Sequence, residues 1–223
     1  MHYYGSVDDA NEVVRRIQDA GGDAVALSAN LIEAGAAENL MENAVEALGP
    51  LTCLINNAST FESDTVLTAT RASWDGHMEV NLRAPFELTQ AFVRQLPEKI
   101  AGNVINIIDQ RVWNLTPDFT TYTLSKAGLW GLTQILARAL APQVRVNGIG
   151  PGPTLPSVHQ SDEEFAEEWS AMPLKRHVTP DDVAAAVRFI LDAPTMTGQM
   201  IAIDAGQHMG GLSPTVEYPA RKE

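Results

Sequence analysis

The chain has 223 residues, of which 45% are hydrophobic, and a formal net charge of −13. This composition is enough for one sizeable core, and the negative charge argues against a nucleic-acid-binding surface, which would need a basic patch. No apolar run approaches the roughly 18 residues of a transmembrane helix and no signal peptide is recognisable, so we expect a cytoplasmic protein without a membrane segment.

The first half of the chain alternates helical and strand-like patterns. A helix is expected over 8–20, where apolar residues form one stripe and two glycines follow. A short apolar run spans 24–28, and a second helix is expected over 36–48, before Gly49. Residues 51–55 are continuously apolar, as is typical of a strand covered on both faces. Cys53, the only cysteine, lies in this run, and we expect it to be buried as a small hydrophobic residue.

The second half continues the alternation. A long helical pattern covers 71–96, with a break expected near Pro85 because proline lacks a backbone N–H. Further strands are expected over 103–108, 144–149 and 200–203, and further helices over 121–140 and 181–191. Alternating strands and helices predict an α/β fold, a doubly wound parallel sheet of Rossmann type in three layers. No linker divides the chain, so we expect residues 1–223 to form one domain.

Two segments depart from the alternation. Residues 153–178 contain prolines and the acidic run Asp162-Glu163-Glu164, which fits either a solvated loop with a short surface helix or a lid-like insertion over the sheet edge. The segment from about 206 onward is rich in glycine and proline, and we expect an irregular C-terminal tail.

Polar and glycine-rich segments follow three of the predicted strands directly. They are Asn56-Asn57-Ala58-Ser59, Asp109 and Gly150-Pro151-Gly152. In parallel sheets of this type, ligands bind beyond the carboxyl ends of the strands. We therefore expect these three segments to share one edge of the sheet and to form a site there.

Tyr122 and Lys126 lie four residues apart at the start of a predicted helix, and Asp109 lies 13 residues before the tyrosine. Spacing of four places the phenol and the ammonium on one helix face. A free phenol has a pKa near ~10, and a cation beside it favours the phenolate and lowers that pKa. The pair alone is a common chance spacing, but beside a cofactor site it predicts a proton donor for a reduction.

Together these motifs resemble the short-chain dehydrogenase/reductase family over nearly the whole chain. The residues that carry the resemblance are Asn56 to Ser59, Asn81 in Val-Asn-Leu, the Tyr122/Lys126 pair and Gly150 to Gly152. The resemblance implies that Tyr122 is the proton donor, that Lys126 binds the nicotinamide ribose and lowers the tyrosine pKa, and that Asn81 supports the lysine.

One departure concerns the substrate. The family usually has serine where Asp109 stands, and a carboxylate cannot donate a hydrogen bond to a carbonyl unless it is protonated. Asp109 suits a substrate that presents N–H groups, and here the chain is similar to the pteridine reductases of the family. That likeness implies that Phe61 stacks on the pterin ring, while Asp109 and Tyr122 contact the substrate.

A second departure concerns the cofactor. The family opens with a strand, a glycine-rich turn and a helix, whereas this sequence begins at what looks like the end of the second family strand. We expect the missing strand to lie mid-sheet, so its absence exposes apolar strand edges. No carboxylate stands at the strand end near Ser6, which favours NADPH over NADH. The resemblance implies a cofactor site formed by Ser6, Asn30, Asn57, Ala58, Ser59, Lys126, Pro151, Gly152 and Thr154.

Three functional hypotheses follow. The first is an NADPH-dependent oxidoreductase that reduces a C=N bond of a pterin or dihydrofolate-like small molecule, with Tyr122 as proton donor, in a relay with Asp109. The second is a carbonyl reductase of 3-oxoacyl or ketone substrates. The third is a non-catalytic relative that binds no cofactor. The family resemblance also implies a homo-oligomer, a tetramer or dimer, paired through the helices at 71–96 and 121–140.

Overall fold

The computed structural model describes residues 1–157 and 160–210. Their strands are all parallel and form two separate sheets. The strands are β1 (His2–Tyr3) paired with β2 (Leu27–Ser28), then β3 (Cys53–Asn56), β4 (Gly102–Ile107), β5 (Val144–Pro151) and β6 (Met200–Ile203) in that spatial order. No helix in these residues is long and apolar enough to cross a membrane.

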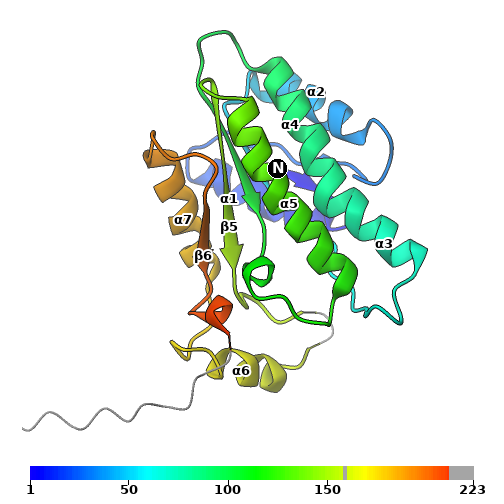
Figure 1. The fold of residues 1–223 in the computed structure, drawn as a ribbon. Helices are drawn as coiled ribbons and strands as arrows, with labels where there is room; N and C mark the ends of the chain where they lie inside the picture. Colours follow the sequence, from blue (N-terminus) through cyan, green and yellow to red (C-terminus); the bar gives the residue numbers. More distant parts are fainter. Residues whose placement is uncertain (158–159, 211–223) are drawn as a thin grey trace, which may run out of the picture.

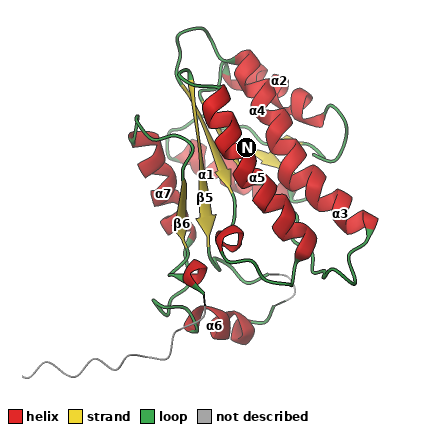
Figure 2. Ribbon diagram, viewed as in Figure 1, coloured by secondary structure: helices red, strands yellow, loops and turns green. Residues whose placement is uncertain are grey.

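Helices flank the strands, and most begin and end close to the predicted limits (Figure 2). They are α1 (Val7–Asp19), α2 (Ala36–Leu48), α3 (Arg71–Met78), α4 (Ala84–Gln95), α5 (Thr120–Ala139), α6 (Asp162–Ser170) and α7 (Pro180–Asp192). Two short 3₁₀ helices follow strands, Gln110–Trp113 after β4 and Gln207–Met209 after β6.

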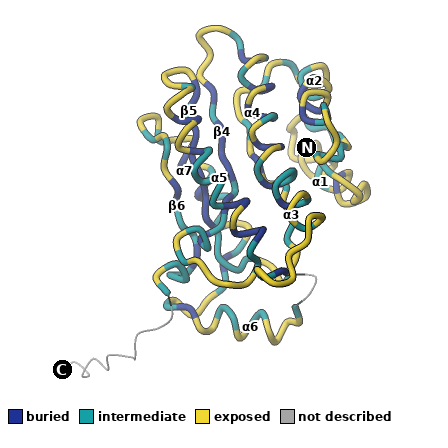
Figure 3. Tube along the Cα trace, turned by 45° about the vertical axis from the view of Figure 1, so that its right-hand side comes forward, coloured by how far each residue is buried: buried dark blue, intermediate teal, exposed yellow. Residues whose placement is uncertain are grey.

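Apolar clusters on both faces of the larger sheet explain the layering. On one face α2, α4 and α5 bury residues such as Leu40, Phe92 and Leu136 against β4 and β5. On the other face α7 buries Ile190 against the same two strands. Figure 1 shows α4 and α5 lying side by side over the sheet, and Figure 3 shows the strands as its most buried part. The predicted doubly wound α/β fold is confirmed.

The expected gap in the sheet is visible between β1 and β3, which do not pair. β3 is therefore an edge strand, and Ile55 on it is 45% exposed. Cys53 is exposed as well, so the prediction of a buried cysteine is wrong. The apolar run at 51–55 indicates a strand covered on both faces, but within the described residues β3 pairs with β4 alone and is left with one open edge.

The predicted break near Pro85 takes the form of a π-helical turn, Glu79–Arg83, between α3 and α4. Pro85 has no N–H to donate to the carbonyl of Asn81, four residues earlier, so a regular α-helix cannot run through this point. The wider turn places the Asn81 side chain in the interior, where it is 0% exposed. Single π turns of this kind are frequently found at functional sites.

The two segments that depart from the alternation both contain helical structure. Helix α6 lies inside the insertion at 153–178, and a capping box formed by Ser161 and Glu164 starts it. The expectation of an irregular tail from 206 is wrong for 207–209, which form the 3₁₀ helix after β6. Asp204 stabilises this turn by accepting a hydrogen bond from the His208 backbone. The rest of the predicted tail, 211–223, lies outside the described residues.

A capping box also starts α7, and it provides a test of the local structure. Thr179 accepts from the Asp182 backbone N–H, and the Asp182 carboxylate accepts from the Thr179 N–H. Thr179→Ala removes an acceptor for one of the first helical N–H groups, so we expect a loss of about 1 kcal/mol in unfolding free energy. For a chain of this size the midpoint of thermal unfolding should fall by about 2–4 °C. The exposed Thr52 supplies a control, and equal melting of Thr179→Ala and Thr52→Ala would contradict the cap.

Candidate active site

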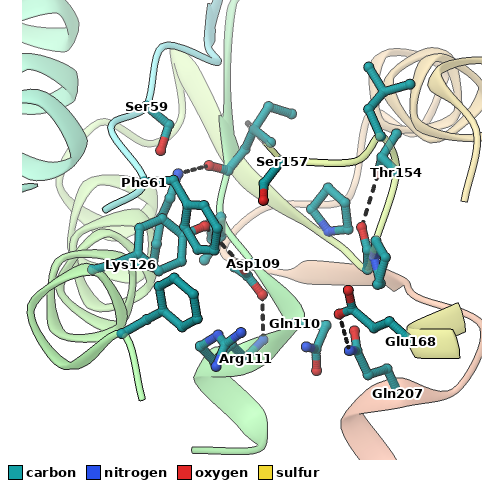
Figure 4. A pocket seen from close by; sticks show the side chains of 18 of the residues that line it. Ser59, Phe61, Asp109, Gln110, Arg111, Lys126, Thr154, Ser157, Glu168 and Gln207 are labelled. Atoms are coloured by element: carbon teal, nitrogen blue, oxygen red, sulfur yellow. Dashed lines mark hydrogen bonds between the residues drawn. The ribbon is translucent and has the colours of Figure 1, made fainter. Parts of the chain in front are cut away.

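The carboxyl ends of β3, β4 and β5 meet at one cavity of about 760 Å³. Asn57, Asp109 and Pro151, each from a different strand exit, line it as the sequence predicts. Helix α5 contributes Tyr122 and Lys126 from one side. The insertion that contains α6 closes another side of the cavity (Figure 4).

Lys126 is almost completely buried, and its ammonium donates to the carbonyl of Ile107 at 3.0 Å. Burial lowers the pKa of Lys126 to about 8, although the Asp109 carboxylate acts in the opposite direction. The Lys126 nitrogen lies 5.7 Å from the centre of the Tyr122 ring, so it faces the ring rather than forming a hydrogen bond with its hydroxyl.

The Tyr122 hydroxyl donates a hydrogen bond of 2.8 Å to Oδ2 of Asp109. Burial, followed by the charge of Asp109 and this hydrogen bond, raises the pKa of Tyr122 well above its usual value. The prediction that Tyr122 has a lowered pKa because of Lys126 is therefore wrong. A carboxylate beside the hydroxyl opposes its ionisation, and the phenol stays protonated at neutral pH.

Asp109 has two roles in the local structure. Its Oδ1 accepts from the backbone N–H of Arg111 at 2.7 Å and caps the short helix after β4, while its Oδ2 accepts from Tyr122. The cap fixes the carboxylate at the end of the strand. Asp109 therefore enters the cavity as a positioned hydrogen-bond acceptor, directly beside the tyrosine hydroxyl.

Asn81 lies behind the cavity and does not line it. Its Oδ1 accepts from the backbone N–H of Thr60 at 2.8 Å and from the Ser59 hydroxyl at 3.2 Å. Its Nδ2 donates to the Ser125 hydroxyl at 3.0 Å, and that hydroxyl donates to the Tyr122 carbonyl. Asn81 thus joins the loop after β3 to the first turns of α5.

A buried polar network holds the beginning of α5 in place. Asp64 accepts from the backbone N–H of Thr121 at 3.1 Å and also from its hydroxyl. That hydroxyl also contacts Nδ1 of His77 at 2.7 Å. Because Thr121 directly precedes Tyr122, this network fixes the start of the helix that presents the tyrosine.

Aromatic rings line the cavity beside Tyr122. Phe61 stacks on Phe119, with ring centres 4.5 Å apart and nearly parallel planes. Tyr122 and Phe61 form a T-shaped pair, with ring centres 4.7 Å apart. The Arg111 guanidinium lies over the Phe119 ring at 5.2 Å. Phe119 has the left-handed φ of 55°, which is unusual for a bulky residue.

Most predicted site residues come together, and some do not. Those that line the cavity are Asn57, Ser59, Phe61, Asp109, Tyr122, Lys126, Pro151, Gly152 and Thr154. Ala58 and Asn81 do not line it, and neither do Ser6 and Asn30. Asn30 instead bonds to Glu33 and to the backbone of Ile32, in the loop after β2.

Several residues that line the cavity were not predicted from the sequence. Gln110 and Arg111 directly follow Asp109, and Phe119 lies three residues before Tyr122, so their positions along the chain were an available signal. Glu168 and Gln207 also line the cavity. They come from an acidic helix and from the predicted tail, and no sequence pattern singled them out.

The cavity residues fit the nicotinamide end of a dinucleotide. Lys126 supplies an ammonium, Tyr122 and Ser59 supply hydroxyls, and Asn57 supplies an amide, which are suitable partners for ribose hydroxyls and a carboxamide. Gly152 packs directly against Asp204 at the start of the segment after β6, because an added Cβ would lie 2.9 Å from Cα of Asp204.

A sequence profile for the family described as enoyl-(acyl carrier protein) reductase matches residues 3–208. The chain belongs to the short-chain dehydrogenase/reductase family. This match and the neighbouring structures confirm the predicted family and fold, and they agree with the predicted class of an NADP-dependent oxidoreductase.

Solved structures of this family are similar over nearly the whole chain. FolM alternative dihydrofolate reductase 1 from Brucella suis, in complex with NADP, superposes with a TM-score of 0.91 and 43% identity, covering 96% of this chain and 85% of that one. A short-chain dehydrogenase from Burkholderia cenocepacia in complex with NADP has a TM-score of 0.85 and 32% identity, over 92% and 85% of the two chains.

A curated relative has a different activity. The 3-oxoacyl-[acyl-carrier-protein] reductase FabG of Staphylococcus aureus is 29% identical over 214 residues, which are 94% of this chain and 87% of that protein. The family therefore includes relatives that correspond to both the first and the second functional hypothesis.

Proposed function

We propose that this protein is an NADPH-dependent reductase of a C=N bond in a pterin or dihydrofolate-like substrate. The observation that carries the proposal is the Tyr122 hydroxyl donating to the Asp109 carboxylate inside the cavity. A carbonyl reductase needs donors around the substrate oxygen, but this carboxylate is an acceptor and repels a carbonyl oxygen. A heterocycle that presents N–H groups satisfies the same carboxylate.

The chain's own residues divide the work. Bound NADPH supplies the hydride. Tyr122 holds a proton at its hydroxyl, because the raised pKa keeps the phenol protonated. Asp109 accepts from a substrate N–H and, in the structure, from the Tyr122 hydroxyl, which turns from Asp109 toward the substrate nitrogen to deliver its proton. Lys126 would hold the cofactor ribose beside them, and Phe61 provides a flat apolar surface for the ring.

The likeness to FolM supports this reading, and the likeness to FabG supports the alternative of a 3-oxoacyl reductase, at lower identity. Steady-state oxidation of NADPH separates the two, with a dihydropterin and dihydrofolate in one arm and a 3-oxoacyl thioester in the other. We expect turnover in the first arm. Turnover with the thioester alone would overturn the proposal, and absence of NADPH binding by calorimetry would favour the non-catalytic alternative.

Lys126 gives the reaction an expected pH dependence. Its pKa is lowered to about 8, so the ammonium loses its charge as the pH rises through that value. We expect kcat/KM for NADPH to fall above about pH 8, with Lys99→Gln, at an exposed lysine, showing the same profile as the natural protein.

The lowered pKa of Lys126 affects folding stability and activity in opposite directions as the pH rises. Between about 8 and the ordinary value of 10.5 the unfolded chain binds more protons at Lys126 than the folded chain does. The contribution of Lys126 to stability therefore increases with pH in this window. Loss of kcat/KM with undiminished thermal stability is the expected pattern, and a flat profile from pH 7 to 10 would contradict it.

The domain and assembly predictions belong to the same proposal. We infer one reductase domain, with the α6 segment as a lid over the cavity and pairing of subunits through α4 and α5. Analytical ultracentrifugation measures the oligomeric state, and a monomer at micromolar concentration would contradict the pairing of subunits.

A further inference from the structure

Three buried polar atoms in the cavity have no hydrogen-bond partner among the described residues. They are Oε1 of Gln110, Nε of Arg111 and Oε1 of Gln207. All three residues line the cavity that contains Tyr122 and Asp109. A buried polar atom without a partner is destabilising, so three at one site point to a ligand that completes them.

The unpartnered atoms include both hydrogen-bond acceptors and a hydrogen-bond donor. Gln110 and Gln207 offer carbonyl oxygens, which accept hydrogen bonds, and Arg111 offers an N–H group, which donates. Gln110 is only 5% exposed, so its amide is held in the cavity wall. Figure 4 shows it between Arg111 on one side and Glu168 and Gln207 on the other.

Neighbouring contacts orient these groups. Nε2 of Gln207 donates to Oε1 of Glu168 at 3.4 Å, so the Gln207 oxygen is the amide atom left for a ligand. One nitrogen of Arg111 donates to the Thr116 hydroxyl at 2.6 Å, and the guanidinium lies over Phe119, which leaves Nε as the free donor. The Glu168 carboxylate adds negative charge to the acceptor side of the cavity.

We propose that Gln110, Arg111 and Gln207, framed by Glu168, form a recognition end of the cavity for a ligand edge that carries N–H groups beside a carbonyl oxygen. Two parts of a folate-like molecule have this chemistry: the amino-oxo pyrimidine edge of the pterin ring and the amide of the side chain. The inference deepens the proposed function, because it names the groups that select such a molecule.

The same arrangement excludes other ligands. A simple ketone or fatty acyl chain leaves both glutamine oxygens without donors, and a carboxylate at this end is repelled by Glu168. The recognition end thus favours N–H-bearing ligands over simple ketones. Asp109 and Tyr122 act at the reacting bond, whereas these residues act on selection.

Calorimetric binding in the presence of NADP⁺ tests the inference without requiring turnover. The variants are Gln110→Met and Gln207→Met, which keep an unbranched side chain of similar length. The ligands are pterin and quinoxaline, a bicycle of similar shape without N–H groups or a carbonyl. We expect each variant to bind pterin about 3- to 10-fold more weakly per lost hydrogen bond, and quinoxaline unchanged.

Thermal unfolding distinguishes recognition from a structural role. Replacing an unpartnered buried amide by an apolar side chain should leave the melting temperature unchanged or raised. Glu168→Gln should also weaken pterin binding, with Glu163→Gln, at an exposed position on α6, as its matched control. Unchanged affinity for both pterin and dihydrofolate in both methionine variants, or parallel losses for pterin and quinoxaline, would overturn the inference.

A comparison of dihydropterin with dihydrofolate identifies the source of the edge. Weakened binding of both ligands assigns the recognition end to the pterin ring, and weakened binding of dihydrofolate alone assigns it to the side-chain amide. Either result supports the inference. If the natural protein binds pterin but does not reduce any dihydropterin, the proposed function fails while the recognition end stands.

Discussion

Replacing Tyr122 by Phe is expected to lower kcat by about 10²- to 10⁴-fold, the usual contribution of a positioned proton donor. The substitution removes only the hydroxyl that donates to Asp109 and keeps the ring that packs against Phe61. NADPH affinity, measured by calorimetry, should stay close to that of the natural protein. Single-turnover kinetics with a dihydropterin measures the chemical step directly.

The matched control is Tyr4→Phe, because Tyr4 is 69% exposed and far along the chain from the cavity residues. It should retain full activity. If Tyr122→Phe reduces a dihydropterin as fast as Tyr4→Phe does, the proton comes from another group, and Asp109 is then the remaining acid beside the substrate.

The sequence predicted most of the fold because its signals are local. Helix stops at glycine, the proline near the α3–α4 junction and the apolar strand runs each act within a few residues. The three strand exits were placed at one edge by the topology of parallel sheets, and the cavity contains residues from all three. The spacing of Tyr122 and Lys126 is also a local signal, because two residues four apart lie on one face of a helix.

Signals that depend on long-range packing were not available. Whether Lys126 or Asp109 controls the Tyr122 pKa depends on which of them reaches the hydroxyl, and the sequence spacing does not determine that. Likewise Glu168 and Gln207 lie far apart along the chain and meet only when α6 folds over the end of β6. Cys53 was misjudged because burial of a strand depends on its neighbours, not on its own residues.

The chemistry of the site rests on the difference between a donor and an acceptor at position 109. Serine at this position donates to a substrate oxygen, as the family usually requires. Aspartate reverses the polarity of that contact and, in addition, raises the pKa of the neighbouring phenol. The two effects are linked, since the carboxylate that accepts from Tyr122 is also the group that we propose to accept from the substrate N–H.

Replacing Asp109 by Ser should therefore change the preferred substrate. We expect kcat/KM for a dihydropterin to fall by about 10²-fold or more, because an acceptor for the substrate N–H is lost at the reacting bond. Turnover of a ketone should remain or rise, since the serine hydroxyl donates where the carboxylate repelled. The measured quantity is the ratio of the two kcat/KM values, which cancels changes in the amount of active protein.

Asp109→Asn separates charge from hydrogen-bonding capacity. Asparagine keeps an oxygen that accepts and is close to isosteric, but it has no negative charge. Because that charge raises the pKa of both Tyr122 and Lys126, the variant should lower both, and the alkaline limb near pH 8 that Lys126 sets should shift to lower pH. If the pterin-to-ketone ratio is unchanged in Asp109→Ser while Asp109→Asn shifts the pH profile, the carboxylate tunes the phenol and does not select the substrate. If the pterin-to-ketone ratio falls in Asp109→Ser while the pH profile of Asp109→Asn is unshifted, the carboxylate selects the substrate and does not tune the phenol.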